Sequence, residues 1–115
     1  MRSNYQELTA YRLSRTLADD VREAAIGWPS FDRWSLGIQL VRAADSVGAN
    51  IAEASGRFRF GDRTRLLHIA RGSAFEVEHW VACAIDRGLL GIHFRGRAEE
   101  VIRVLAGLIR SQADP

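Results

Sequence analysis

The segment from Leu40 to Ala54 limits the fold most, because it carries two adjacent stripes of residues at helical spacing. One stripe is apolar and consists of Leu40, Ala44, Val47, Ile51 and Ala54. Steps of three and four residues place such side chains on one face of an α-helix. The second stripe is polar and consists of Gln39, Arg42, Ser46, Asn50 and Glu53. The pattern predicts a helix that packs its own core on one face and meets partner helices on the next, and these can belong to another subunit.

The same periodicity recurs in three other segments, which predicts four helices in all. Their expected ranges are about 4–26, 30–54, 62–87 and 97–111. Gly27 with Pro29, the glycines around 56–61 and Gly88 predict the helix ends, because glycine favours a helix stop and proline cannot continue a helix. Nothing is typical of a strand. We therefore expect one all-α domain over residues 1–115, folded as an antiparallel up-down-up-down four-helix bundle.

Several residues are expected to act at the ends of these helices. Asn4 with Glu7, Ser30 or Asp32, and Asp62 are candidate N-caps. Glu99 and Glu100 are expected in the first turn of the last helix and Arg110 in its last turn. Trp28 and Phe31 are expected to plug one end of the core. Gly48 and Gly72 are expected where helix backbones approach closely, because glycine within a helix costs about 0.5–1 kcal/mol relative to alanine.

Composition points to an ordinary globular protein with a weakly basic balance. The chain has 115 residues and a formal net charge of +2, and all of its basic side chains are arginines. A charge this small is weak support for a polyanionic partner. The single cysteine, Cys83, suits a reducing compartment. No segment has the apolar pattern of a signal peptide or a membrane span, so the expected location is the cytoplasm.

Candidates for catalysis or metal binding are weak. Glu76 and His79 have the Glu-x-x-His spacing of di-iron bundles, but such a site needs two copies of the motif and two further carboxylates. Only one copy is present. Cys83 is expected to be a buried small residue rather than a reactive thiol. We therefore predict no enzyme activity, no catalytic residues, no cofactor and no metal site.

Two other groups of residues are better candidates for function. Around the second turn, basic and aromatic side chains alternate: Arg57, Phe58, Arg59, Arg63 and Arg65. Such a cluster can bind phosphates and stack bases. The alternative is that the phenylalanines cover the end of the bundle while the arginines are solvated or pair with a neighbouring subunit, and the small net charge favours this alternative. The second group is a predicted structural polar layer made of Arg42, Ser46, Asn50, Glu53, Ser73, Glu76 and Glu78. Within that layer, Arg42 is expected to pair with Glu76 or Glu78 and so to fix helix register.

Two stretches carry a resemblance to a known family. The first is Arg42-Ala43-Ala44 with Ser46, then Asn50-Ile51-Ala52-Glu53 and Gly56-Arg57; the second is Ile69-Ala70 with Gly72-Ser73, Glu76 and Glu78. In this combination the chain resembles the bacterial four-helix-bundle proteins named after intervening sequences in 23S ribosomal RNA genes. Weaker similarity extends from Leu8 to about Leu108. The chain departs from the family at Gly48, where proline is frequent, and at Ala54-Ser55, where the family has a direct Glu-Gly junction.

The resemblance implies an antiparallel bundle that assembles as a ring, commonly a homopentamer, with no established enzymatic role. It therefore favours a structural or interaction protein of unknown cellular role, whose expected partner is itself. The alternative is an accessory protein that binds RNA or DNA through the arginine-rich hairpin, as the accessory protein of diversity-generating retroelements works with nucleic acid. A protein partner is not identified by either interpretation.

Overall fold

The computed structural model describes residues 4–5 and 8–113, and these contain helices and connecting turns but no strand. Four helices are long: α1 (Thr9–Ile26), α3 (Ile38–Ser55), α4 (Phe60–Asp86) and α5 (His93–Arg110). Two short helical segments, α2 (Ser30–Asp32) and the π-helical η2 (Arg33–Gly37), lead directly into α3. The prediction of an all-α fold with four principal helices is confirmed.

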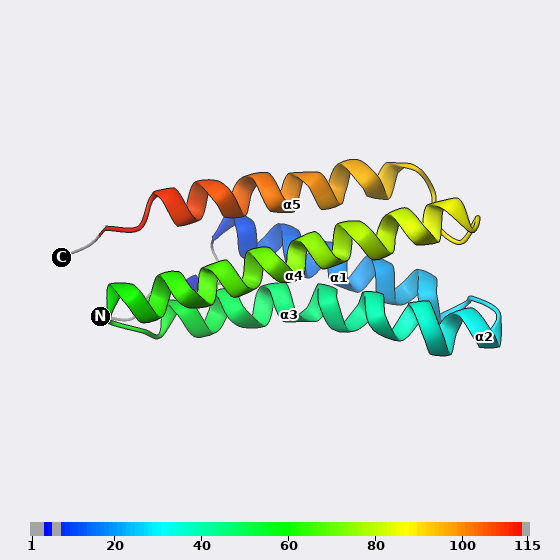
Figure 1. The fold of residues 1–115 in the computed structure, drawn as a ribbon, viewed down its shortest axis with the longest axis horizontal. Coiled ribbons are helices and arrows are strands. Elements are labelled where there is room, and N and C mark those ends of the chain that lie inside the picture. Colours follow the sequence, from blue (N-terminus) through cyan, green and yellow to red (C-terminus); the bar gives the residue numbers. More distant parts are fainter. Residues whose placement is uncertain (1–3, 6–7, 114–115) are drawn as a thin grey trace.

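The four long helices lie side by side in an elongated molecule with principal extents of 49 × 21 × 20 Å (Figure 1). α3 packs against α1 and α4, and α5 packs against α4 and α1, so each long helix has two long neighbours. The turn after α3 and the turn after α4 lie at opposite ends of the molecule (Figure 1). This arrangement is compatible with the up-down-up-down order expected from the sequence.

The N-terminal ends of the helices differ from the sequence prediction. α1 begins at Thr9 rather than near Asn4, and its N-cap, Leu8, makes no side-chain capping bond. Glu7, the expected partner in that cap, lies outside the described residues. Ser30 and Asp32 do not cap the second helix, because Pro29 already holds the N-cap position and its carbonyl accepts the Arg33 N–H at 2.9 Å.

The third and fourth helices, in contrast to α1, begin earlier than predicted. Asp62 lies inside the first turn of α4, whose N-cap is Arg59. A carboxylate there still complements the helix dipole. α5 begins at His93, because the Gly91–Ile92 turn carries the chain directly into it, so Glu99 and Glu100 lie beyond the first turn. Arg110 does lie in the last turn, as predicted.

Glycine ends two helices by different means. Gly27 follows α1 as predicted, but its φ of −86° is right-handed. Gly88 takes the left-handed conformation, with φ at 71°. There the Leu89 N–H bonds to the Ala84 carbonyl at 2.8 Å and the Gly88 N–H bonds to the Ile85 carbonyl at 3.0 Å. These two bonds form a Schellman motif, which accounts for the stop predicted at Gly88.

One end of the core is covered by Trp28 but not by Phe31. Trp28 is 7% exposed, and its indole N–H donates to the Leu89 carbonyl at 2.9 Å, which ties the end of α1 to the turn after α4. Phe31 is 83% exposed, so the prediction that it plugs the core is wrong for this chain. Its place in the short α2 turns the ring outward, away from the core.

The two mid-helix glycines also have different surroundings. Gly48 is buried, and a Cβ added there would lie 3.4 Å from Ser14 Oγ and 3.5 Å from Tyr11 Cε1. α1 and α3 therefore approach closely at this point, as predicted. Gly72 is exposed and has nothing within 4 Å of the corresponding position. The close approach predicted at Gly72 does not occur within the chain.

Candidate interaction surfaces

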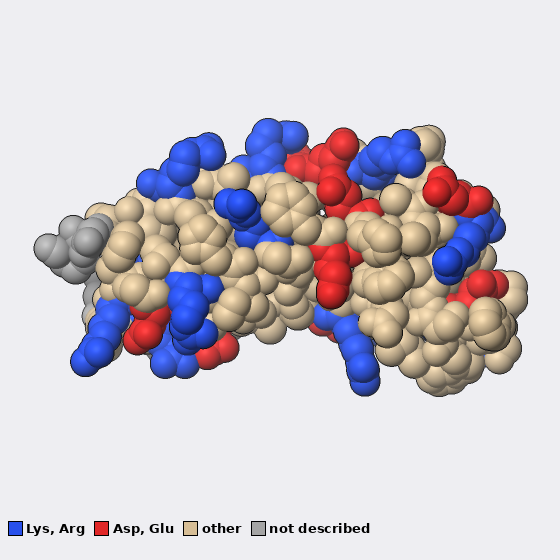
Figure 2. Space-filling view, viewed as in Figure 1, with Lys and Arg blue, Asp and Glu red and all other residues tan. Residues whose placement is uncertain are grey.

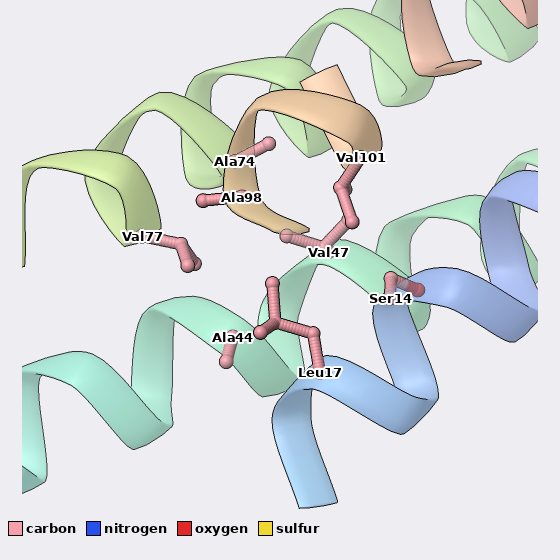
Figure 3. Close-up of a pocket in the computed structure, with 8 residues that line it drawn as sticks. All are labelled: Ser14, Leu17, Ala44, Val47, Ala74, Val77, Ala98 and Val101. Carbon is pink, nitrogen blue, oxygen red and sulfur yellow. The ribbon is translucent and has the colours of Figure 1, made fainter. Parts of the chain in front are cut away.

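The centre of the bundle is filled by side chains from all four long helices. Figure 3 shows Ser14, Leu17, Ala44, Val47, Ala74, Val77, Ala98 and Val101 converging on one small space. Its volume is about 10 Å³, which is at the lower limit for a single water molecule. Small alanine side chains let the helices come close enough to close the space. The centre of the bundle therefore has no room for a ligand.

The predicted polar layer is only partly assembled in the structure. The hydroxyl groups of Ser46 on α3 and Ser73 on α4 are hydrogen-bonded to one another. Asn50 lies beside them, and its Nδ2 donates to the Ser46 carbonyl at 2.8 Å. These three side chains are half-buried at the contact between α3 and α4. They form a short polar contact that links the two helices.

The charged members of the predicted layer point elsewhere. Arg42, Glu53 and Glu76 are exposed, and Glu78 is half-buried. Glu53 instead pairs with Arg57, one turn along the chain, at 2.7 Å. Among the described residues there is no ion pair between Arg42 and Glu76 or Glu78. The prediction that Arg42 makes such a pair inside the chain is wrong, because Arg42 and Glu76 both lie on the solvent side of their helices.

The arginine-rich hairpin presents an exposed aromatic ring among basic side chains. Phe58 is 78% exposed in the turn between α3 and α4. Arg59 and Arg65 are exposed nearby, and Arg57 is exposed but engaged with Glu53. Basic side chains gather towards this end of the molecule and along α5 in Figure 2. An exposed phenylalanine beside exposed guanidinium groups is the arrangement that base stacking and phosphate contacts require.

Arg63, the fifth member of the hairpin cluster, has a structural role. Its Nε donates to Gln112 Oε1 at 2.8 Å, and its Nη2 donates to the Ala113 carbonyl at 3.0 Å. Its Nη1 donates to the Phe58 carbonyl at 3.1 Å. One guanidinium therefore ties the C-terminal segment to the α3–α4 turn. This leaves Arg63 the least available of the hairpin arginines for a phosphate.

Cys83 and His79 lie together on α4, a relationship that was not predicted from the sequence. Cys83 is half-buried rather than buried, and its Sγ lies 3.8 Å from His79 Nε2. The spacing of four residues along the helix was the available signal. No group of three or more histidine, cysteine or acidic side chains that could hold a metal ion occurs in the described part of the chain.

An apolar groove between α1 and the η2–α3 segment was also not predicted. It has a volume of about 250 Å³ and is lined by Ile26, Trp34, Ile38 and Val41. Arg22, Arg33 and Arg42 also line it. Trp34 is 66% exposed, so its ring is not used by the core. The available signal was the extra apolar positions at 34, 38 and 41, which repeat at helical spacing outside the core stripe.

These features define the protein as an all-α four-helix domain whose distinctive residues lie on its surface. The chain belongs to the 23S rRNA-intervening sequence protein family, which matches residues 6–107. It is also similar to a protein of unknown function from the S23 ribosomal protein family, solved by crystallography from Bacteroides thetaiotaomicron. That similarity has a TM-score of 0.78 at 21% identity and covers 90% of this chain and 100% of the other, so it shows a shared fold. The family resemblance predicted from the sequence is confirmed.

Two further comparisons do not narrow the function beyond this family. None of the curated proteins compared with the chain matches it. Among the described residues, no helix combines the length and the apolar character that crossing a membrane requires.

Proposed function

We propose that this protein is a non-enzymatic structural or interaction protein that assembles as a cyclic homo-oligomer, with the homopentamer as the expected form. The observation that carries the proposal is the number of large apolar side chains left exposed by a small chain. They are Ile26, Phe31, Trp34, Phe58, Ile69, Phe75 and Ile92. Where such side chains gather into patches, they mark an interaction site in a soluble protein.

The distribution of these residues favours a ring over a simple dimer. Ile26 and Trp34 lie at the groove between α1 and η2–α3, whereas Ile69 and Phe75 lie on the outer side of α4. A two-fold dimer buries the same patch on both subunits, whereas a ring buries two different patches. The elongated bundle suits this geometry, since its long helices can stand side by side around a common axis.

Sedimentation velocity over a range of protein concentrations tests the proposal. A single fast species is expected, whose mass is an integral multiple of 12.9 kDa and does not change on dilution. A species at 12.9 kDa throughout the range would contradict it.

A second candidate function, nucleic-acid binding, is favoured by the exposed Phe58 between Arg57 and Arg59. In this case the ring would act as an accessory protein, and its symmetry would repeat the basic hairpin so that weak contacts add through multivalency. Affinity would come mainly from phosphate contacts, so log affinity should fall linearly with log salt. Fluorescence anisotropy with labelled single-stranded RNA, structured RNA and duplex DNA, each over a salt series, measures this slope.

The hairpin arginines give the matched variants for that titration. Arg59→Ala and Arg65→Ala are each expected to weaken binding and flatten the salt slope. Arg95→Ala is the control, because Arg95 is exposed near the start of α5, at the opposite end of the molecule (Figure 1). If the wild-type protein shows no salt-sensitive binding to any of the three nucleic acids at low ionic strength, the accessory function fails and the structural ring remains.

A further inference from the structure

We propose that the groove between α1 and η2–α3 receives the outer face of α4 from a second copy of this chain. In this contact Arg42 and Arg33 of one copy face Glu76 and Asp86 of the next. The inference rests on the proposed homo-oligomer and adds to it the two surfaces that meet. It also explains why Arg42 and Glu76, expected to pair from the sequence, are both exposed and unpaired with each other within one chain.

The groove is shaped to accept an apolar ridge with negative charge beside it. Its walls are largely apolar, and every charged side chain that lines it is an arginine. Arg33 is held in place, since its Nη1 donates to the Ile26 carbonyl at 3.2 Å and its guanidinium lies 5.7 Å from the Trp34 ring centroid. Gly37 contributes to this shape, because a Cβ there would meet the Asp32 carbonyl at 3.3 Å and Ala25 at 3.5 Å.

The outer face of α4 supplies such a ridge. Phe75, Glu76, His79, Cys83 and Asp86 follow one another along this side of the helix, mostly at steps of three and four. Phe75 is 46% exposed, and the guanidinium carbon of Arg71 lies 5.7 Å from its ring centroid. Glu76 and Asp86 are the exposed acidic residues of the ridge. In Figure 2, acidic side chains form a band across the middle of the face shown.

The positions of these charges along the bundle match. The Ser46–Ser73 contact fixes the level of α3 against α4, and Arg42 and Glu76 each lie one turn from it towards the same end of the molecule. At a rise of 1.5 Å per residue, Arg33 lies about 13 Å beyond Arg42, and Asp86 lies about 15 Å beyond Glu76. A rotation about an axis parallel to the helices keeps these levels. Both arginines can therefore face both carboxylates at once.

The chain carries both the groove and an α4 ridge that matches it, so a second copy is the partner that we propose for the groove. The groove is formed by α1 and η2–α3, and the ridge lies on α4, so the contact joins two different surfaces. After two copies bind, the first still has a free ridge or groove and the second has the other surface free, so a further copy can bind at either end. Such a head-to-tail contact closes into a ring when the rotation per subunit allows it. An acidic amphipathic helix from another protein would satisfy the same groove, and charge reversal with rescue separates the two occupants.

Charge reversal is made in the full-length protein. Arg42→Glu and Glu76→Arg are each expected to raise the dissociation constant of the oligomer at least about tenfold, because like charges then face one another. The double variant carries the same two charges in exchanged positions and is expected to assemble again. Arg103→Glu and Glu99→Arg are the matched controls, since both residues are exposed on α5. Far-UV circular dichroism checks that every variant remains helical.

The outcomes separate this inference from the proposed function. If the wild-type protein is monomeric, the oligomer and the contact both fail. If the wild-type protein is an oligomer and the two single variants keep its mass, the contact is overturned, the groove is open to a different occupant, and the proposed oligomer stands. If the single variants dissociate and the double variant does not reassemble, the direct pairing of Arg42 with Glu76 is overturned.

Discussion

Ser46 on α3 and Ser73 on α4 share a single hydrogen bond between their hydroxyl groups. The two residues come from helices that pack against each other, and each is half-buried. If α3 shifted by one turn along α4, the apolar side chains on either side of this pair would still meet apolar neighbours. A polar pair loses its partner when that happens, so the contact fixes the level of α3 against α4.

Removing either hydroxyl should destabilise the protein modestly. We expect Ser46→Ala and Ser73→Ala each to lower the free energy of unfolding by about 1 kcal/mol, because the remaining hydroxyl loses its partner. The double variant should cost less than the sum of the two, since it leaves no unpaired group behind. Urea unfolding at one fixed protein concentration measures this. Ser111→Ala is the control, because the Ser111 hydroxyl is exposed and bonds locally to the Leu108 carbonyl at 2.7 Å. Strict additivity would contradict the pairing.

Arg63 should matter for stability and Arg59 should not. Arg63→Ala removes the hydrogen bonds to Gln112, Ala113 and Phe58, and we expect a loss of about 1–3 kcal/mol, the usual range when a charged donor is removed. Arg59→Ala should change the free energy of unfolding by less than about 0.5 kcal/mol, as for most exposed positions. Chemical unfolding of the two variants side by side tests this. Equal effects would mean that Arg63 does not anchor the C-terminal segment.

Phe58 should be dispensable for folding. Because its ring is mostly exposed, Phe58→Ala should leave the free energy of unfolding within about 0.5 kcal/mol of wild type. Phe94→Ala is the comparison, since Phe94 is buried in the core and its truncation should cost about 3–5 kcal/mol. If Phe58→Ala is as damaging as Phe94→Ala, Phe58 packs against something that the single chain does not contain.

The same variant also tests nucleic-acid binding. Loss of single-strand binding by Phe58→Ala at unchanged stability would support a stacking role for the ring, worth about 1–3 kcal/mol per base.

Gly72 offers a stabilising substitution. A Cβ at this position meets no atom within 4 Å, so Gly72→Ala should gain about 0.5–1 kcal/mol from helix propensity alone. Differential scanning calorimetry should show a rise of a few degrees in Tm. Gly48→Ala is the comparison, because its Cβ would lie against Ser14 and Tyr11 at the edge of ordinary contact distance, so it should gain less. A fall in Tm for Gly72→Ala would contradict this prediction.

Helical periodicity was enough to predict the principal helices, because burial of one face dominates the choice of structure. It predicted Leu40, Val47 and Ile51 as core residues, and all three are almost fully buried. The helix starts were less predictable. Several polar residues near each start could serve as caps, and local backbone geometry at Pro29 and Gly91 decided where the first turn formed.

The surface was predicted less well for a different reason. Polar spacing on one helix does not say whether a side chain reaches its neighbour or points to solvent, and Arg42 and Glu76 point to solvent. The role of Arg63 depends on Gln112 and Ala113, which are distant in sequence and come together only in the folded chain. The groove is formed in part by the π-helical segment η2. Helical periodicity does not distinguish a π-helical turn from an α-helical one, so the groove could not be predicted from the sequence.

The proposed function requires a closed ring of identical subunits. Native mass spectrometry of the wild-type protein counts those subunits directly. One dominant species is predicted, with a mass five times that of the 12.9 kDa chain and with no ladder of intermediate sizes. A spectrum dominated by the 12.9 kDa chain itself, under conditions that preserve other assemblies, would contradict the proposed ring.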